Sequence, residues 1–290
     1  FTLSAPTFSV ALGHSMAFVV HKPAAGLRTS LARVAAKPGE SGGAAARQLN
    51  GLLSRASRSQ LLALLGERGS EMDHMHLSNF WNKLGAHQRR CPRRRAWLEQ
   101  HLDGIQGLQE LTVKRLHQCD ARALATIAHG AAHSRFRAEE VVSLFDDLAD
   151  FAQHRLKRFN PQDLSLTVWA FAVVRVPAPG LFAAVARVMP RRIHEFPPQD
   201  AANALWALAI SRAGVAGLFQ TIGLVLPQRL DKFKAQDLAN VARAYALASV
   251  TVPSLLSAIA TASCLPSLVR SWMPQDMADL AWAFAHFTQL

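Results

Sequence analysis

The chain has 290 residues, half of them hydrophobic, so it can bury a substantial core. Its formal net charge of +12 at pH 7, with a pI near 10.7, favours a polyanionic partner, either nucleic acid or an anionic surface. The three cysteines lie far apart and form no CxxC pair, which argues against a disulfide framework and favours a reducing compartment.

The first 39 residues contain no Asp or Glu, and Arg, Lys and Ser are scattered among many Ala. This composition is typical of an organellar transit peptide, although an unstructured tail without targeting value is the alternative. A glycine-rich linker follows, so we expect residues 1–43 to be a disordered, transit-peptide-like segment and linker. The expected location is the mitochondrial matrix, with the plastid as the alternative. Polar residues such as His14 and His21 interrupt the apolar patches, so we expect no membrane span.

Residues 44–158 show a helical pattern with two degenerate copies of a repeat. The first copy places Met75 where later copies have an Asp, and the second copy places Asp120 there. Five arginines lie between these copies and form either a phosphate-binding patch or a solvated loop. They are Arg89, Arg90, Arg93, Arg94 and Arg95.

A strong repeat occupies residues 159–290, where a phrase ending in Gln-Asp returns four times. The four aspartates are separated by 37, 37 and 39 residues, the length of a helix pair in a solenoid. They are Asp163, Asp200, Asp237 and Asp276. Proline and Asp suit the first turn of a helix, so each phrase predicts a helix start. The sequence therefore predicts an all-α fold over residues 44–290, an α-solenoid of stacked helix-pair repeats of ~37–45 residues.

Six residues after each Asp stands a bulky residue, and an Ala follows it. The bulky residues are Trp169, Trp206, Arg243 and Trp282. We expect the tryptophans to fill the core between repeats and the alanines to allow close backbone approach. Because the sequence stops inside such a helix, we also expect it to be truncated at the C-terminus.

No catalytic or cofactor-binding motif stands out. The chain has no glycine-rich phosphate loop, and no Cys or Ser forms a recognisable motif with a His and an acid. The pair His129 and His133 has no further ligand at a recognisable spacing. We therefore expect no enzyme activity, no cofactor and no metal.

The phrase is best preserved in residues 196–209, which read Phe-Pro-Pro-Gln-Asp-Ala-Ala-Asn-Ala-Leu-Trp-Ala-Leu-Ala. It resembles the octotricopeptide-type helical repeats of organellar RNA-binding proteins, and is similar to RAP-domain and FAST-kinase-like proteins. It is also similar to helical subunits of the mitochondrial RNA-editing substrate-binding complex. The resemblance implies an α-solenoid that binds single-stranded organellar RNA in RNA processing, stability, editing or translation. No RAP module is recognised before Leu290, so a nuclease-like activity of that module is not carried over.

In such proteins a few side chains per repeat read bases while basic residues hold phosphates. Three residues after the aspartates lie the base-reading candidates Asn203, Asn240 and Asp279. Eight residues before the aspartates lie the phosphate-binding candidates Arg155, Arg192 and Arg229. Buried amides and an ordinary solvated arginine face are the alternatives. The rival function is a non-catalytic scaffold that binds other proteins of a mitochondrial ribosome or RNA-editing ribonucleoprotein complex.

Overall fold

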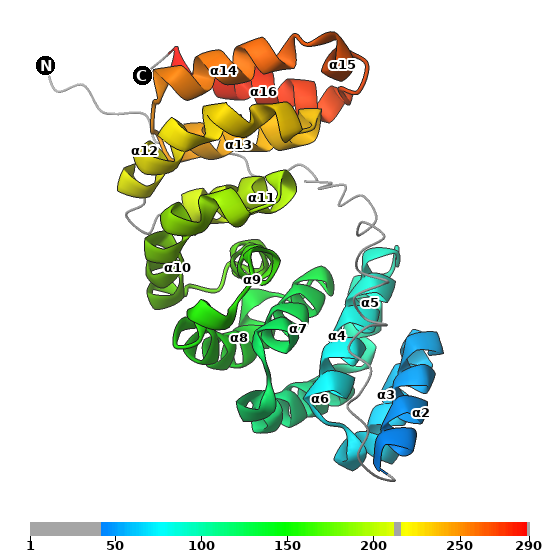
Figure 1. The fold of residues 1–290 in the computed structure, drawn as a ribbon. Coiled ribbons are helices and arrows are strands. Elements are labelled where there is room, and N and C mark those ends of the chain that lie inside the picture. The colour runs from blue at the N-terminus through cyan, green and yellow to red at the C-terminus, as the bar shows by residue number, and fades with distance from the viewer. Residues whose placement is uncertain (1–41, 212–215, 289–290) are drawn as a thin grey trace, which may run out of the picture. The chain divides into compact units, whose positions relative to one another are not determined.

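The computed structural model describes residues 42–211 and 216–288, and all regular elements in these ranges are helices, fifteen of them α-helices (Figure 1). The prediction of an all-α fold is confirmed. The chain divides into two compact units, Phe1–Arg47 and Gln48–Leu290. The expected transit-peptide-like segment lies outside the described residues, apart from Gly42 and Gly43 at the start of the first described helix.

Within the second unit the helices form two rows. The inner row consists of α4 (His74–Arg89), α7 (Ala121–His133), α9 (Pro161–Val174), α11 (Pro198–Ser211), α13 (Ala235–Leu247) and α16 (Pro274–Phe287). The outer row consists of α3 (Arg58–Arg68), α6 (Leu102–Arg115), α8 (Ala138–Gln153), α10 (Pro179–Arg192), α12 (Ala216–Val225) and α14 (Pro253–Ser263). The shorter helices α5 (Arg94–Gln100) and α15 (Pro266–Val269) lie in connections, and α2 spans Gly42–Arg55.

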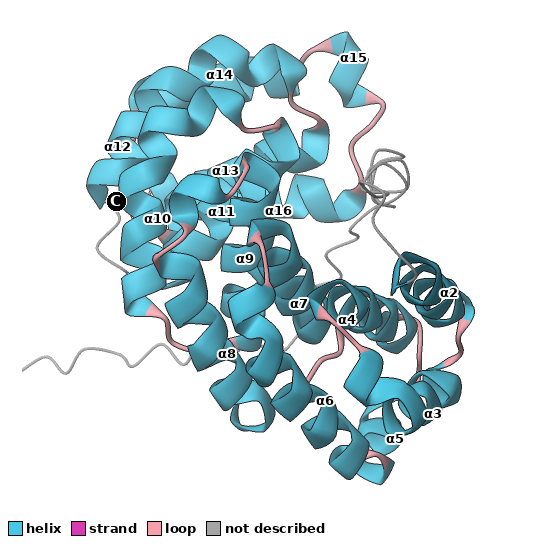
Figure 2. Cartoon of the chain, turned by 60° about the horizontal axis from the view of Figure 1, so that its bottom comes forward, coloured by secondary structure: helices cyan, strands magenta, loops and turns pink. Residues whose placement is uncertain are grey.

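Each inner helix packs against the next, and each outer helix does the same, as in a solenoid. Figure 2 shows the inner row lying inside the outer row. A 3-10 turn follows most outer helices and leads into the inner helix of the same repeat. These turns are η1 (Gly69–Glu71), η2 (Leu116–Gln118), η3 (Leu156–Arg158), η4 (Ile193–Glu195) and η5 (Leu226–Lys232).

The helix starts correct the alignment of the two degenerate repeats. Asp120 caps α7 by accepting a hydrogen bond from the Ala123 amide at 2.7 Å, whereas Asp163 is the third residue of α9. Asp120 therefore corresponds to the capping residue Asn160, three positions from the column predicted for it. Met75 is the second residue of α4, so it was placed one position out of register. The error at Asp120 arises because a capping Asp and an Asp of the first turn serve the same orphan N–H groups.

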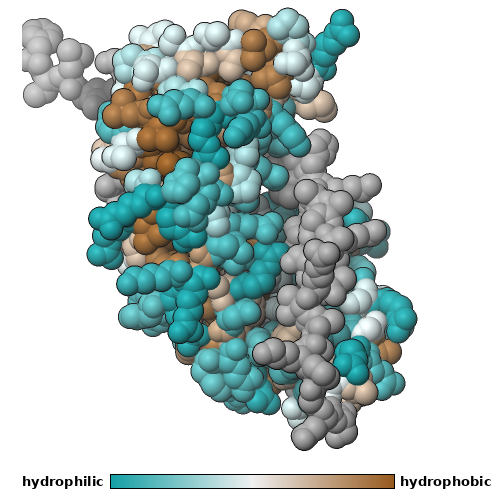
Figure 3. All heavy atoms as spheres, in the orientation of Figure 1, coloured by the Kyte–Doolittle hydropathy of each residue, from teal (hydrophilic) through white to brown (hydrophobic). Residues whose placement is uncertain are grey.

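The predicted tryptophan core forms where another inner helix covers it. Trp169 and Trp206 are buried, but 45% of Trp282 is exposed, because α16 is the last helix of the described row. Four other large apolar residues near this end of the chain are exposed as well, namely Leu265, Val269, Met273 and Met277. In the orientation of Figure 1, hydrophobic patches accordingly appear in the upper part of the surface, where α12 to α15 lie (Figure 3).

A column of small residues brings successive inner helices close together. Ala170, Ala207, Ala244 and Ala283 are all fully buried, and Gly130 occupies the same position in α7. A Cβ atom added to Gly130 would lie 2.4 Å from the Trp81 carbonyl carbon and oxygen of α4. The backbones of α4 and α7 therefore touch where no side chain fits between them.

We expect Gly130→Ala to lower the free energy of unfolding by about 1–3 kcal/mol or more, because backbone atoms cannot yield as a side chain would. Urea denaturation of the purified chain would measure the loss. Gly107→Ala is the matched control: Gly107 lies in α6 with nothing within 4 Å of its would-be Cβ. That control should be stabilised by about 0.5–1 kcal/mol, since alanine favours helix more than glycine. Equal effects at the two positions would contradict the close approach.

The repeated aspartates lie near one another at the starts of adjacent inner helices. Burial, together with the charges of Asp237 and Asp163, raises the pKa of Asp200 to about 6, although the charge of Arg122 opposes the rise. Burial also raises the pKa of Asp163 and of Asp237. Asp163 pairs with Arg122 at 3.0 Å, but no ion pair of Asp200 or Asp237 is found among the described residues. The aspartate column therefore opposes the folded state at neutral pH.

A raised pKa means that folding favours the protonated carboxyl. The stabilisation from Asp200 is complete below its ordinary pKa near 3.8 and is lost as the pH rises through about 6. We expect Asp200→Asn to raise the free energy of unfolding by about 1 kcal/mol at pH 7 and to leave it nearly unchanged at pH 4. Thermal unfolding between pH 4 and 8 would measure the difference. Asp231→Asn changes an exposed aspartate and should shift neither value; a loss of stability at pH 7 in Asp200→Asn would refute the repulsion.

None of the helices in the described ranges is long and apolar enough to cross a membrane.

Candidate nucleic-acid interface

The arginine row predicted to bind phosphates connects neighbouring repeats. Each guanidinium donates to the carbonyl of the residue that follows the 3-10 turn of the preceding repeat. Arg155, Arg192 and Arg229 donate to Cys119, Phe159 and Phe196 at 2.9, 2.9 and 3.0 Å. These hydrogen bonds satisfy carbonyls that the helices leave unpaired, so the periodicity of the arginines has a structural cause. Binding of phosphate by their remaining N–H groups stays a prediction.

The base-reading candidates lie close to the packed interior. Asn240 is 8% exposed, and Asn203 is half-buried. Asp279 forms an ion pair with Arg243, whose guanidinium lies 5.7 Å from the centre of the Trp282 ring. The arginine that replaces a tryptophan in this repeat is therefore paired and packed on the next inner helix. Base reading stays a prediction for all three residues, and the burial of Asn240 argues against it there.

The arginine-rich turn joins the end of α4 to α5, and its five arginines differ in their surroundings. Arg95 forms ion pairs with Glu140 at 2.6 Å and with Glu99 at 2.7 Å. The other four side chains form no hydrogen bond or ion pair within the described ranges, and three of them are exposed. These four are Arg89, Arg90, Arg93 and Arg94.

This turn lies beside another arginine, Arg135, which stands two residues after the end of α7. Although Arg135 is an exposed residue, partial burial lowers its pKa, and the nearby charge of Arg94 lowers it further. Arg89 and Arg135 both act on the same neighbour, His133, whose pKa is lowered by burial and by their charges to about 4. The positively charged side chains of the turn therefore lie close to Arg135. No acidic residue in the described part of the chain forms an ion pair with Arg135.

The backbone conformation at the ends of the inner helices was not foreseen. Among the described residues, three that are not glycine have positive φ, and all occupy the fifteenth position counted from the start of an inner helix. They are Arg135 (φ 60°), Arg175 (φ 65°) and Ser249 (φ 52°). Glycine is the usual residue after a helix that ends in this way, because side chains strain the left-handed conformation. Arg212 has the same position in its repeat but lies outside the described residues.

Two histidines lie between the arginines and the core. The Nε2 atoms of His129 and His133 are 3.1 Å apart, and both rings lie within 5.3 Å of the Trp169 ring centre. Burial lowers the pKa of both, so both are neutral at pH 7 and one donates to the other. The described residues contain no group of three or more potential metal ligands, so this pair has no further ligand in them.

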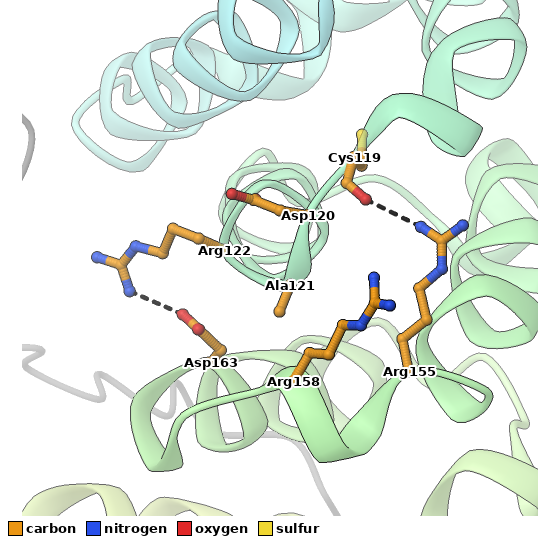
Figure 4. A pocket seen from close by; sticks show the side chains of 7 residues that line it. All are labelled: Cys119, Asp120, Ala121, Arg122, Arg155, Arg158 and Asp163. Atoms are coloured by element: carbon orange, nitrogen blue, oxygen red, sulfur yellow. Dashed lines mark hydrogen bonds and ion pairs between the residues drawn. The ribbon is translucent and has the colours of Figure 1, made fainter. Parts of the chain in front are cut away.

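At the opposite end of α7 lies a pocket of about 210 Å³. It is lined by Cys119, Asp120, Ala121, Arg122, Arg155, Arg158 and Asp163. Figure 4 shows the guanidiniums of Arg155 and Arg158 on one side of Ala121, and the side chains of Asp120 and Arg122 on the other. Arg122 donates to Asp163 at 3.0 Å, whereas the Arg158 side chain has no hydrogen-bond or ion-pair partner in the described part of the chain.

Comparison with protein-family models and with curated proteins finds no match for this chain. The resemblance to octotricopeptide-type repeats therefore rests on the sequence phrases alone.

Proposed function

We propose that this chain binds single-stranded RNA through its sugar-phosphate backbone, at the end of the inner row where the helices finish. We name this surface the arginine edge. It consists of Arg89, Arg90, Arg93, Arg94, Arg135 and Arg175. The observation that carries the proposal is the arginine in left-handed conformation at the ends of two neighbouring inner helices.

A strained conformation persists only where something offsets its cost, and glycine would remove the strain at both positions. The arginines are instead exposed and form no side-chain hydrogen bond or ion pair in the described residues. Favourable interaction with the negative ends of helices α7 and α9 accounts for part of the preference. It does not require arginine at two successive repeats, because lysine or histidine in the last turn has the same effect.

The spacing of these arginines suits a linear polyanion. Helices in contact lie roughly 8–10 Å apart, so equivalent side chains on α7 and α9 offer successive contacts along a strand. Guanidinium groups bind phosphates with paired, charge-assisted hydrogen bonds. The four unpaired arginines of the turn after α4 extend the edge by one further repeat. Phosphate contacts of this kind hold a strand without reading its sequence.

We place this activity in an organelle, the mitochondrial matrix or alternatively the plastid, on the composition of the first 39 residues. There the protein would act in RNA processing, stability, editing or translation. A protein scaffold is the rival, and it predicts weak RNA binding that does not depend on the arginine edge.

The double change Arg135→Gly and Arg175→Gly should move stability and RNA affinity in opposite directions. Relief of backbone strain should leave the free energy of unfolding unchanged or raise it by up to about 1 kcal/mol. Loss of two phosphate contacts should weaken binding about tenfold or more and reduce the log–log salt dependence by about 1.4, roughly 0.7 per contact on a single strand. Fluorescence anisotropy with a labelled single-stranded RNA at several KCl concentrations would measure both quantities.

Two controls separate the backbone from the charge. Ser249→Gly makes the same backbone change without removing a charge, and should leave RNA affinity unaltered. Arg187→Gln with Arg191→Gln removes two exposed charges from α10, away from the edge, and should weaken binding much less. Equal losses in the two double variants would reject the arginine edge. Failure of the unaltered chain to bind RNA would reject the function and favour the scaffold.

A further inference from the structure

The pocket beside the start of α7 includes the turn η3, where a position that carries glutamate in η1 and η4 carries an arginine. An arginine immediately precedes each of the first four 3-10 turns, and in two of them a glutamate three residues later neutralises it. Arg68 pairs with Glu71 at 2.6 Å, and Arg192 pairs with Glu195 at 2.8 Å. In the pocket the arginine is Arg155, and the residue three positions later is Arg158. Two cations therefore replace an ion pair.

Among the described residues, neither acid of the pocket forms an ion pair with these two cations. The Asp163 carboxylate is engaged by Arg122 at 3.0 Å, and the Asp120 carboxylate accepts the Ala123 amide at 2.7 Å. Burial raises the pKa of Cys119 to about 12, so its thiol stays neutral. Arg155 uses Nη1 for the Cys119 carbonyl and retains other N–H groups, while Arg158 has all its side-chain donors available among the described residues.

We propose that this pocket binds a phosphate monoester, held between the guanidiniums of Arg155 and Arg158. A monoester carries between about −1.5 and −2 charges at pH 7, which matches two guanidiniums, whereas a carboxylate or a backbone diester would balance one. The pocket volume of about 210 Å³ is several times the ~30 Å³ that one water occupies, so a phosphate group fits. The phosphate belongs either to the end of an RNA strand or to a small phosphate ester.

The site is independent of the arginine edge. The two lie at opposite ends of α7, whose 13 residues span roughly 20 Å at 1.5 Å per residue. A variant of one site therefore leaves the other unchanged, and the two proposals succeed or fail separately.

Inorganic phosphate is the first probe. At 10 mM it should raise the melting temperature of the full chain by about 3 °C, with equal ionic strength maintained by chloride in the reference. Arg158→Glu rebuilds the pair seen at Arg192 and Glu195, so it should fold normally and lose the response. The converse change, Glu195→Arg, should create a second pocket and increase the response.

Equal phosphate responses in the unaltered chain and in Arg158→Glu would overturn the site. If neither Arg158→Glu nor Glu195→Arg folds, Arg158→Gln can be tested in their place. It removes the charge and should still abolish the rise in melting temperature with phosphate. No response of the unaltered chain at 10 mM phosphate would also overturn the proposal.

Two RNA strands of the same sequence, one with a 5′-phosphate and one with a 5′-hydroxyl, distinguish the sources. Tighter binding of the phosphorylated strand by at least fivefold, lost in Arg158→Glu, would identify an RNA end as the ligand. Equal binding of both strands, with the phosphate response intact, would identify a small phosphate ester. A chain that binds phosphate but no RNA would reject the proposed function and retain the pocket.

Discussion

The close approach of successive inner helices is the constraint on which the other features of this solenoid depend. It is possible because a column of glycine and alanine, from Gly130 in α7 to Ala283 in α16, leaves at most a methyl group between the backbones. Adjacent helices running the same way then bring like groups together at both ends. At their starts, burial and the charges of neighbouring aspartates raise the pKa of Asp200, and at the ends of α7 and α9 arginines follow each other from repeat to repeat. Tight packing of the inner helices therefore comes with unfavourable electrostatic interactions between like charges at their ends.

Arginines in this chain have two different roles, although they look alike in sequence. The row at Arg155, Arg192 and Arg229 joins repeats through backbone carbonyls, which a long side chain with five donors reaches well. The arginines that follow α7 and α9 have no such partners among the described residues, and they occupy strained backbone positions. Exposed, unpartnered cations at strained positions indicate function more strongly than periodic cations do, because packing explains the latter.

The helix pairs were predictable from the sequence because the 37-residue spacing and the helix-start chemistry agree with each other. The register of the degenerate repeats was not, since Asp120 at a cap resembles Asp163 in a first turn. The site was predictable only in part. Periodicity located Arg155 and its equivalents, but a sequence does not show that a carbonyl lies within reach of a guanidinium. The spacing from Arg135 to Arg175 and Arg212, 40 and 37 residues, follows the helix starts closely, and a search for arginine columns would have found it.

Single substitutions within the common frame show how the repeats differ from one another. In α13, Arg243 takes the position of a tryptophan. Its guanidinium forms an ion pair with Asp279 and lies over the ring of Trp282, both on the next inner helix. That substitution is balanced inside the protein, so it needs no external partner. At η3, Arg158 takes the position that glutamate has in η1 and η4, and no described residue balances it. Because the same turn carries a neutralised arginine in η1 and η4, the excess charge beside α7 follows from Arg158 and not from the fold.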